Sequence, residues 1–121
     1  MQLQILSIDD SKAVLKYIEW VFSKSNHSVE TFLSGREALA NIQKNTTKYD
    51  LILLDWEMPD LDGIGVLEEL KRESIKIPVA MLTSKNNEED IKKAIEYGVE
   101  EFIMKPFTPE LLLEKIEEIC E

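Results

Sequence analysis

The sequence has little of what marks a secreted or membrane-spanning protein. Its 121 residues include a single cysteine, Cys120, which cannot form an internal disulfide and fits a reducing cytoplasm. No apolar run approaches the roughly 20 residues that span a bilayer. The first ten residues, MQLQILSIDD, do not have the layout of a signal peptide. We therefore expect a cytoplasmic protein with no membrane partner.

Positive charge is also scarce. Lys and Arg together number 14 and Asp and Glu 24, a formal net charge of −10. This balance repels the phosphates of nucleic acids and of anionic membranes, so we expect no direct binding of nucleic acid. No repeat, low-complexity tract or linker interrupts the chain. Residues 1–121 are therefore expected to form one domain, long enough for a hydrophobic core.

Short apolar segments alternate with amphipathic ones along the whole chain. The apolar segments predict strands at residues 3–8, 28–32, 51–54, 77–82 and 101–104, each followed by a helix. Such alternation favours an α/β fold with a five-stranded parallel sheet covered by five helices. Right-handed crossovers that put helices on both faces indicate the strand order 2-1-3-4-5.

Apolar residues at helical spacing indicate which residues face the core. In the helix expected over residues 87–97, we expect three inward residues: Ile91, Ala94 and Ile95. Trp20 lies nearly opposite the apolar stripe of the first helix and should be exposed. His27, in a polar turn, is expected to be solvated. Three methionines are expected to pack rather than to bind ligands: Met58, Met81 and Met104.

Polar side chains stand at the ends of four predicted strands. They are Asp9 and Asp10, Asp55, Thr83 and Lys105. Parallel strands bring their carboxyl ends to one edge of the sheet, so these groups should converge. Three carboxylates within about 4–6 Å raise one another's pKa unless a cation lies among them. Oxygen ligands with room for water favour Mg²⁺, and the lysine and hydroxyl suit an anion beside it, for which a phosphoryl group is the obvious candidate.

Each of these residues alone also has a plainer explanation. Asp9 and Asp10, or Asp55, can be acids that cap the following helix, and Thr83 can be an ordinary β-branched residue at a strand end. Phe102, in the fifth predicted strand, can be a core residue. The joint placement of the polar residues on four strand ends is what favours a functional site.

These residues resemble the signature of a response-regulator receiver domain of two-component signalling, similar to chemotaxis regulators and with a flavodoxin-like fold. The resemblance covers essentially the whole chain. It rests on Asp9-Asp10 after the first strand, Asp55 in DWEMPDLDG, Thr83 in MLTS and Lys105 in MKPF. It implies that Asp55 accepts a phosphoryl group from a histidine kinase or phosphotransfer protein. It implies a phosphoacceptor signalling domain that is not an enzyme but catalyses its own phosphorylation and dephosphorylation. Phosphorylation would then change the surface that an unknown downstream protein or output domain recognises.

The resemblance also implies a role for each site residue. Mg²⁺ would be bound by Asp10, by the Asp55 carboxylate and by the backbone carbonyl of Glu57, with Asp9 acting through metal-bound water. Lys105 would contact the phosphoryl oxygens and Thr83 would donate to one of them. Thr83 and Phe102 would form the switch.

The resemblance also bears on two local features of this chain, the aromatic residue at position 102 and the peptide bond before Pro106. Receivers usually carry an aromatic residue, often Tyr, where this chain has Phe102, which has no hydroxyl to bond outside the core. The K-P-F pattern implies a cis Lys105-Pro106 bond, although only about 5–6% of X-Pro bonds in folded proteins are cis.

Two further positions should overhang the mouth of the site. Glu57 follows the nucleophile by two residues and Lys85 follows Thr83 by two. Their opposite charges predict a pair that partly covers the path of attacking water.

Other functions are compatible with parts of this pattern. A flavodoxin-like flavin binder needs a Ser/Thr- or Gly-rich loop after the first strand, where this chain has two aspartates. A haloacid-dehalogenase-type phosphatase carries a D-x-D pattern there, which Asp9-Asp10-Ser11 does not match. A degenerate receiver that only binds proteins would not need the full acidic set. The sequence leaves open whether the chain is a single-domain regulator or a receiver from a longer protein.

Overall fold

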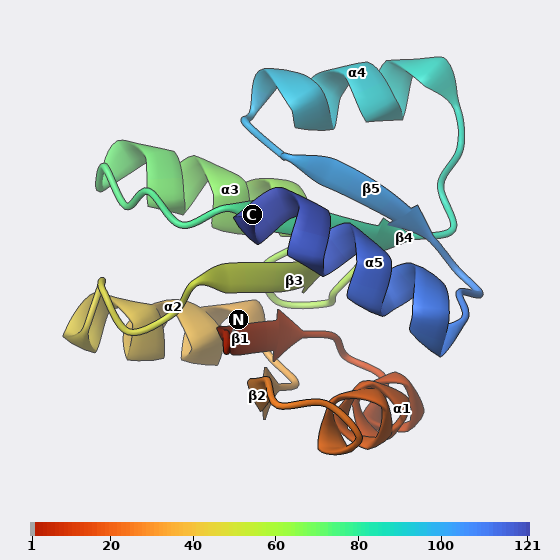
Figure 1. The fold of residues 1–121 in the computed structure, drawn as a ribbon. Coiled ribbons are helices and arrows are strands. Elements are labelled where there is room, and N and C mark those ends of the chain that lie inside the picture. Colours follow the sequence, from red (N-terminus) through yellow and green to blue (C-terminus); the bar gives the residue numbers. More distant parts are fainter. Residues whose placement is uncertain (1) are drawn as a thin grey trace.

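Five parallel strands form one sheet in the order β2-β1-β3-β4-β5 (Figure 1). The structure is a computed structural model, and it describes residues 2–121. The strands are β1 (Gln4–Ile8), β2 (Ser28–Phe32), β3 (Leu51–Asp55), β4 (Val79–Thr83) and β5 (Glu101–Met104). The helices are α1 (Lys12–Ser23), α2 (Gly35–Lys44), α3 (Gly63–Arg72), α4 (Glu88–Glu96) and α5 (Pro109–Cys120). The predicted fold class and strand order are confirmed.

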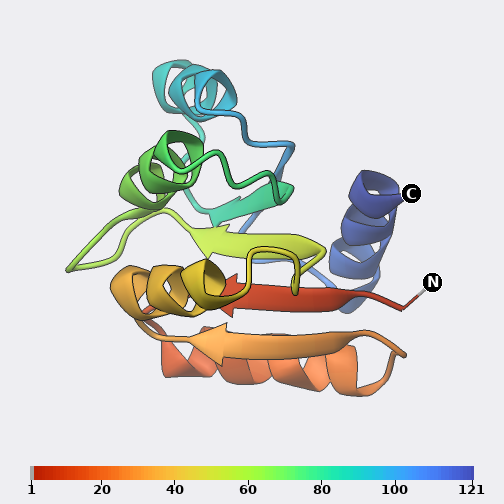
Figure 2. The ribbon, with the colours of Figure 1, turned by 90° about the vertical axis from the view of Figure 1, so that its left-hand side faces the viewer.

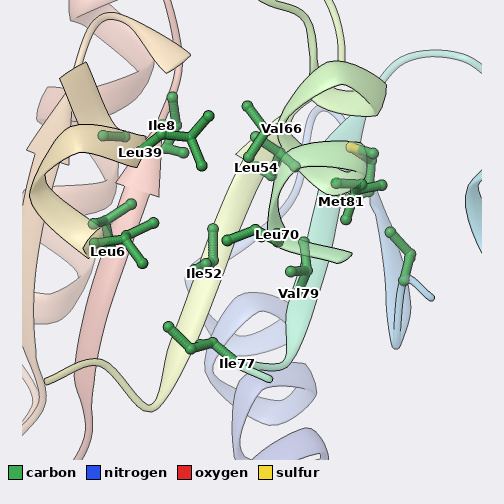
Figure 3. Packing of buried hydrophobic residues seen from close by; sticks show 14 of the residues in the cluster. Leu6, Ile8, Leu39, Ile52, Leu54, Val66, Leu70, Ile77, Val79 and Met81 are labelled. Carbon is green, nitrogen blue, oxygen red and sulfur yellow. The ribbon is translucent and has the colours of Figure 1, made fainter. Parts of the chain in front are cut away.

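The helices cover both faces of the sheet (Figure 2). One hydrophobic cluster joins the sheet to α2, α3 and α4, and includes the residues shown in Figure 3, such as Leu39, Leu54 and Val66. The other joins the opposite face to α1 and α5, through residues such as Ile18 and Leu112. Burial on both faces explains why β3 is apolar until its last residue.

Strand register brings the functional strand ends together. Leu54 pairs with Ile8 of β1, and the next residue, Asp55, pairs with Leu82 of β4. Thr83 in turn pairs with Met104 of β5. The residues after these pairs therefore emerge at one edge, as expected for the carboxyl ends of parallel strands.

Local signals in the sequence begin and end the helices. Ser11, Ser34 and Thr108 accept backbone N–H bonds at the starts of α1, α2 and α5. Gly98 has a φ of +93° after α4, a conformation that favours glycine. The predicted fourth strand starts two residues later than expected, at Val79, because Pro78 has no N–H for the ladder.

Gly63 keeps the loop after β3 close to the site. Its N–H donates to the Trp56 carbonyl at 2.7 Å. A Cβ at this position would lie only 2.9 Å from the Asp55 carbonyl oxygen. The absence of a side chain therefore permits the close approach of α3 to the end of β3.

Three predictions about burial were wrong. His27 is buried, because its Nδ1 accepts the Leu3 N–H at 3.1 Å and its Nε2 lies 3.1 Å from Glu117 Oε2. Ile95 is 58% exposed, because α4 buries only Ala94. Met104 is 38% exposed, because it ends the edge strand β5, whereas Met58 and Met81 are buried as predicted.

Trp20 is 51% exposed, which confirms its predicted position on the outer face of α1. Within residues 2–121, no helix combines the length and the apolar character needed to cross a membrane.

Candidate functional site

Lys105 lies between two carboxylates at the carboxyl edge of the sheet. Its Nζ is 2.9 Å from Asp9 Oδ2 and 3.0 Å from Asp55 Oδ1. The Asp9 side chain is 1% exposed and that of Asp55 10%, whereas the lysine is 24% exposed. Residues from the ends of β1, β3 and β5 thus meet in one polar cluster, as the sequence predicted.

Asp10 completes an acidic group that can hold a cation. One carboxylate oxygen from each of Asp9, Asp10 and Asp55 lies within 4.8 Å of the others. Asp9 accepts the Ser11 N–H at 2.9 Å through Oδ1, the oxygen that is not bonded to Lys105, while Asp10 is exposed. Oxygen donors open to solvent on one side fit the ligand and water requirements of Mg²⁺.

The electrostatics of the cluster favour an added cation. The pKa of Asp55 is raised to about 6: burial is the largest cause and the charges of Asp9 and Asp10 act in the same direction, while Lys105 works in the opposite direction. Burial opposes the charge on Lys105, but hydrogen bonds to Asp9 and Asp55 outweigh it and raise the pKa of Lys105. A divalent cation among the carboxylates would favour the ionised form of Asp55.

Thr83 lies at the end of β4 beside this cluster. Its side chain is buried and its Oγ1 accepts the Lys85 N–H at 2.9 Å. Its carbonyl accepts the Lys105 N–H at 3.0 Å, which joins the ends of β4 and β5. Phe102 is half-buried and packs against the core cluster of α2, α3 and α4. The Lys105-Pro106 bond is cis, as predicted.

The predicted pair at the mouth of the site is present. Lys85 Nζ lies 3.7 Å from Glu57 Oε1, and the Glu57 side chain is 73% exposed. Sequence reasoning missed two further contacts of this lysine: Asp90 Oδ2 at 3.8 Å and the Trp56 ring, whose centroid is 5.6 Å from Nζ. Glu88, Glu89 and Asp90 form an acidic first turn of α4, and this was the available signal.

Known proteins share both this sequence pattern and this fold. The family model described as "Response regulator receiver domain" matches residues 5–117. The chain belongs to this family. It is a receiver domain of two-component response regulators, a class of phosphoacceptor signalling domains. Receiver domains typically use Mg²⁺, for which the acidic group described above is suited.

Curated relatives of this receiver domain are longer proteins. The chain is 36% identical over 109 residues to the alkaline phosphatase synthesis transcriptional regulatory protein PhoP of Bacillus subtilis, covering 90% of the chain and 45% of PhoP. It is 30% identical over 112 residues to the response regulator SaeR of Staphylococcus aureus, covering 93% and 48%. The chain therefore spans about half the length of these relatives.

Solved receiver structures match over nearly the full length. The chemotaxis protein CheY4 of Vibrio cholerae superimposes with a TM-score of 0.90 at 29% identity, covering 98% of this chain and 99% of that one. The receiver domain of the Francisella response regulator 1452 also has a TM-score of 0.90, at 30% identity, covering 98% and 96%.

Proposed function

We propose that this receiver domain accepts a phosphoryl group on Asp55. The observation that carries the proposal is the position of Lys105 Nζ, 3.0 Å from Asp55 Oδ1 and 2.9 Å from Asp9 Oδ2. A cation at that point can neutralise phosphoryl oxygens arriving at Asp55. The donor would be a phosphohistidine on a histidine kinase or phosphotransfer protein.

The reaction is an in-line displacement at phosphorus. A carboxylate oxygen of Asp55 forms the new O–P bond as the P–N bond to the donor imidazole breaks, and the imidazole keeps that electron pair and takes up a proton. Mg²⁺, when bound, supplies charge neutralisation at the phosphoryl oxygens. Asp10, the Asp55 carboxylate and the Glu57 backbone carbonyl would hold it. Asp9 would act from the outer shell, which its existing bonds to Ser11 and Lys105 support.

Thr83 and Phe102 form the proposed switch. Thr83 Oγ1 at present accepts the Lys85 N–H, so its hydroxyl proton is available for a phosphoryl oxygen. Movement of Thr83 toward that oxygen vacates space that the Phe102 ring can fill. The phosphoryl group thereby biases two states of the domain, and the altered surface is recognised by a downstream protein or output domain.

The direct test is incubation with a small phosphodonor such as acetyl phosphate, with Mg²⁺ and with EDTA. We expect a labile mass increase of about 80 Da, one phosphoryl group, in the Mg²⁺ sample only. The same site should then let water hydrolyse the acyl phosphate. A purely protein-binding receiver would show no adduct in either sample.

Trp20 is expected to contribute to docking of the kinase. Trp20 is 51% exposed on α1, its ring is stacked with the Tyr17 ring at a centroid distance of 6.1 Å, and Lys24 Nζ lies 5.2 Å from its centroid. An ordered, exposed Trp is a typical anchor of protein interfaces. Trp20→Ala should slow phosphotransfer from the cognate kinase but leave the reaction with acetyl phosphate unchanged. Transfer from the kinase at the wild-type rate would exclude the docking role.

The Glu57–Lys85 pair is expected to prolong the phosphorylated state. Attacking water must approach Asp55 from the mouth of the site, where the pair lies. Because an exposed pair contributes only about 0–1 kcal/mol, and about 1.4 kcal/mol changes a rate tenfold, the effect should be severalfold. Glu57→Gln and Lys85→Ala should each shorten the lifetime, and the double variant should shorten it little more.

Decay of the phosphorylated protein in buffer without EDTA measures these lifetimes. The matched control is the pair Lys115–Glu101, which has a 3.4 Å separation and a lysine as exposed as Lys85 (30% against 31%) but spans α5 and the start of β5. Lys115→Ala should leave the lifetime unchanged. Additive effects of the two mouth substitutions, or none, would contradict the shielding.

A further inference from the structure

The segment of residues 105–107, which carries Lys105, follows the edge strand β5 and is connected to the sheet through its one neighbouring strand, β4. The Lys105 N–H donates to the Thr83 carbonyl, which joins the residue to β4. After Lys105 the chain leaves the sheet and reaches α5 at Pro109, where Thr108 caps the helix. The position of the ammonium group therefore depends on what holds residues 105–107 from the other side.

Tyr17 of α1 holds this segment at two points. Its hydroxyl donates to the Phe107 carbonyl at 3.1 Å. Its ring also contacts the Phe107 ring, with centroids 5.7 Å apart and planes inclined by 50°. Both residues are half-buried against the α1–α5 core cluster, so the contact is part of the packed structure rather than a surface encounter.

The space around this contact is otherwise open. A cavity of about 550 Å³ lies between α1 and the segment, lined by Ala13, Val14, Tyr17, Lys105, Pro106 and Phe107. Three residues of α1 line this cavity, and of these Tyr17 is the one whose side chain hydrogen-bonds to the segment. Loss of its hydroxyl would leave the Phe107 carbonyl beside this open space without that donor.

We propose that Tyr17 is a positioning residue for Lys105; this rests on the proposed phosphorylation of Asp55. Lys105 must keep its Nζ within hydrogen-bond distance of side chains from two strands, Asp9 and Asp55. Catalysis by charge neutralisation is sensitive to a displacement of about 1 Å. Tyr17 limits such displacement by fixing the backbone two residues beyond Lys105.

The test measures the rate of phosphorylation by acetyl phosphate, which needs no kinase docking. Tyr17→Phe removes only the hydroxyl, and the loss of one hydrogen bond should slow the reaction between about two- and tenfold. Tyr17→Ala, which also removes the ring contact, should slow it more.

The matched control is Tyr49→Phe. The Tyr49 hydroxyl also donates a hydrogen bond, to Glu30 at 3.0 Å, but it lies between α2 and β3, far from Lys105. Tyr49→Phe should leave the rate unchanged.

A double-variant comparison separates positioning from a general structural role. If Tyr17 acts through Lys105, Tyr17→Phe should have no further effect in a Lys105→Ala protein. A wild-type rate for Tyr17→Phe, or the same slowing in both backgrounds, overturns the inference.

Where the Lys105→Ala rate is too slow to compare, a crystal structure of Tyr17→Phe decides. Displacement of Nζ beyond hydrogen-bond distance of Asp9 or Asp55 supports the inference, and unchanged distances overturn it. Absence of an adduct in the wild-type protein would instead overturn the proposed function, and this inference with it.

Discussion

Asp55→Asn should abolish the Mg²⁺-dependent phosphoryl adduct. The substitution replaces a nucleophilic carboxylate oxygen by a neutral amide of almost the same shape. Of the three clustered aspartates, Asp55 is the one at the end of the central strand, between β1 and β4. Asp9 is already bonded to Ser11 and Lys105, so it is not free to take the place of Asp55. We therefore expect complete loss rather than a slower reaction, measured by intact mass after incubation with acetyl phosphate.

Folding of this variant can be checked separately from its chemistry. An amide at position 55 removes one of the buried negative charges and leaves the Lys105–Asp9 pair in place, so the melting temperature should be unchanged or higher. Asp60→Asn is a suitable control, because Asp60 lies in the same loop and bonds to the Ser34 hydroxyl at 2.6 Å outside the acidic cluster. An undiminished adduct in Asp55→Asn would refute the assignment of the phosphoacceptor.

Lys105→Ala should destabilise the domain strongly when no divalent cation is present. The substitution leaves the Asp9 and Asp55 carboxylates close together with little solvent, since their side chains are 1% and 10% exposed. Breaking a buried ion pair costs about 3–5 kcal/mol, and partial exposure of the lysine favours the lower end. For a domain of this size, about 3 kcal/mol corresponds to a fall in melting temperature of roughly 10 °C.

Mg²⁺ should recover much of this loss. The three aspartates remain in Lys105→Ala, so metal binding should persist and neutralise the carboxylates in place of the ammonium group. The increase in melting temperature on adding Mg²⁺ should therefore be larger than in the wild type. Phosphorylation by acetyl phosphate and the subsequent switching should both remain weakened, because the contact of Lys105 with the phosphoryl oxygens is lost. Lys115→Ala, which breaks the partly exposed pair with Glu101, should change the melting temperature little. Equal melting temperatures for Lys105→Ala and wild type without Mg²⁺ would contradict this account.

The strand order and the convergence of Asp9, Asp55 and Lys105 followed from local patterns. Apolar runs that end on polar residues predict buried parallel strands, and parallel strands place those ends at one edge. The pairing of Glu57 with Lys85 was predicted from their distance along the chain to two such ends. These features depend on short stretches of sequence and on one topological rule, which is why they were accessible without coordinates.

The features that were missed or wrong depend on contacts between distant residues. His27 is separated by 24 residues from Leu3 and by 90 from Glu117, and nothing near His27 in the sequence indicates either partner. Tyr17 and Phe107 are likewise 90 residues apart. Ile95 has the spacing of a core residue, but α4 presents a narrow buried face centred on Ala94. Periodicity identifies an apolar face without showing how much of it the neighbouring elements cover.

The buried His27 connects the segment before β1 to the end of α5. This connection lies at the edge of the sheet where the strands begin, opposite the edge that carries Asp55. The His27 ring bonds to Leu3, just before β1, and to Glu117 in the last turn of α5. Cys120 Sγ likewise lies 3.8 Å from the carbonyl oxygen of Asp50, which precedes β3. A fluorescent reporter fused at either terminus would therefore sit clear of the acidic cluster. Linking the present termini by a short flexible peptide and opening the chain at an exposed loop should likewise yield a circular permutant that keeps the reaction edge intact.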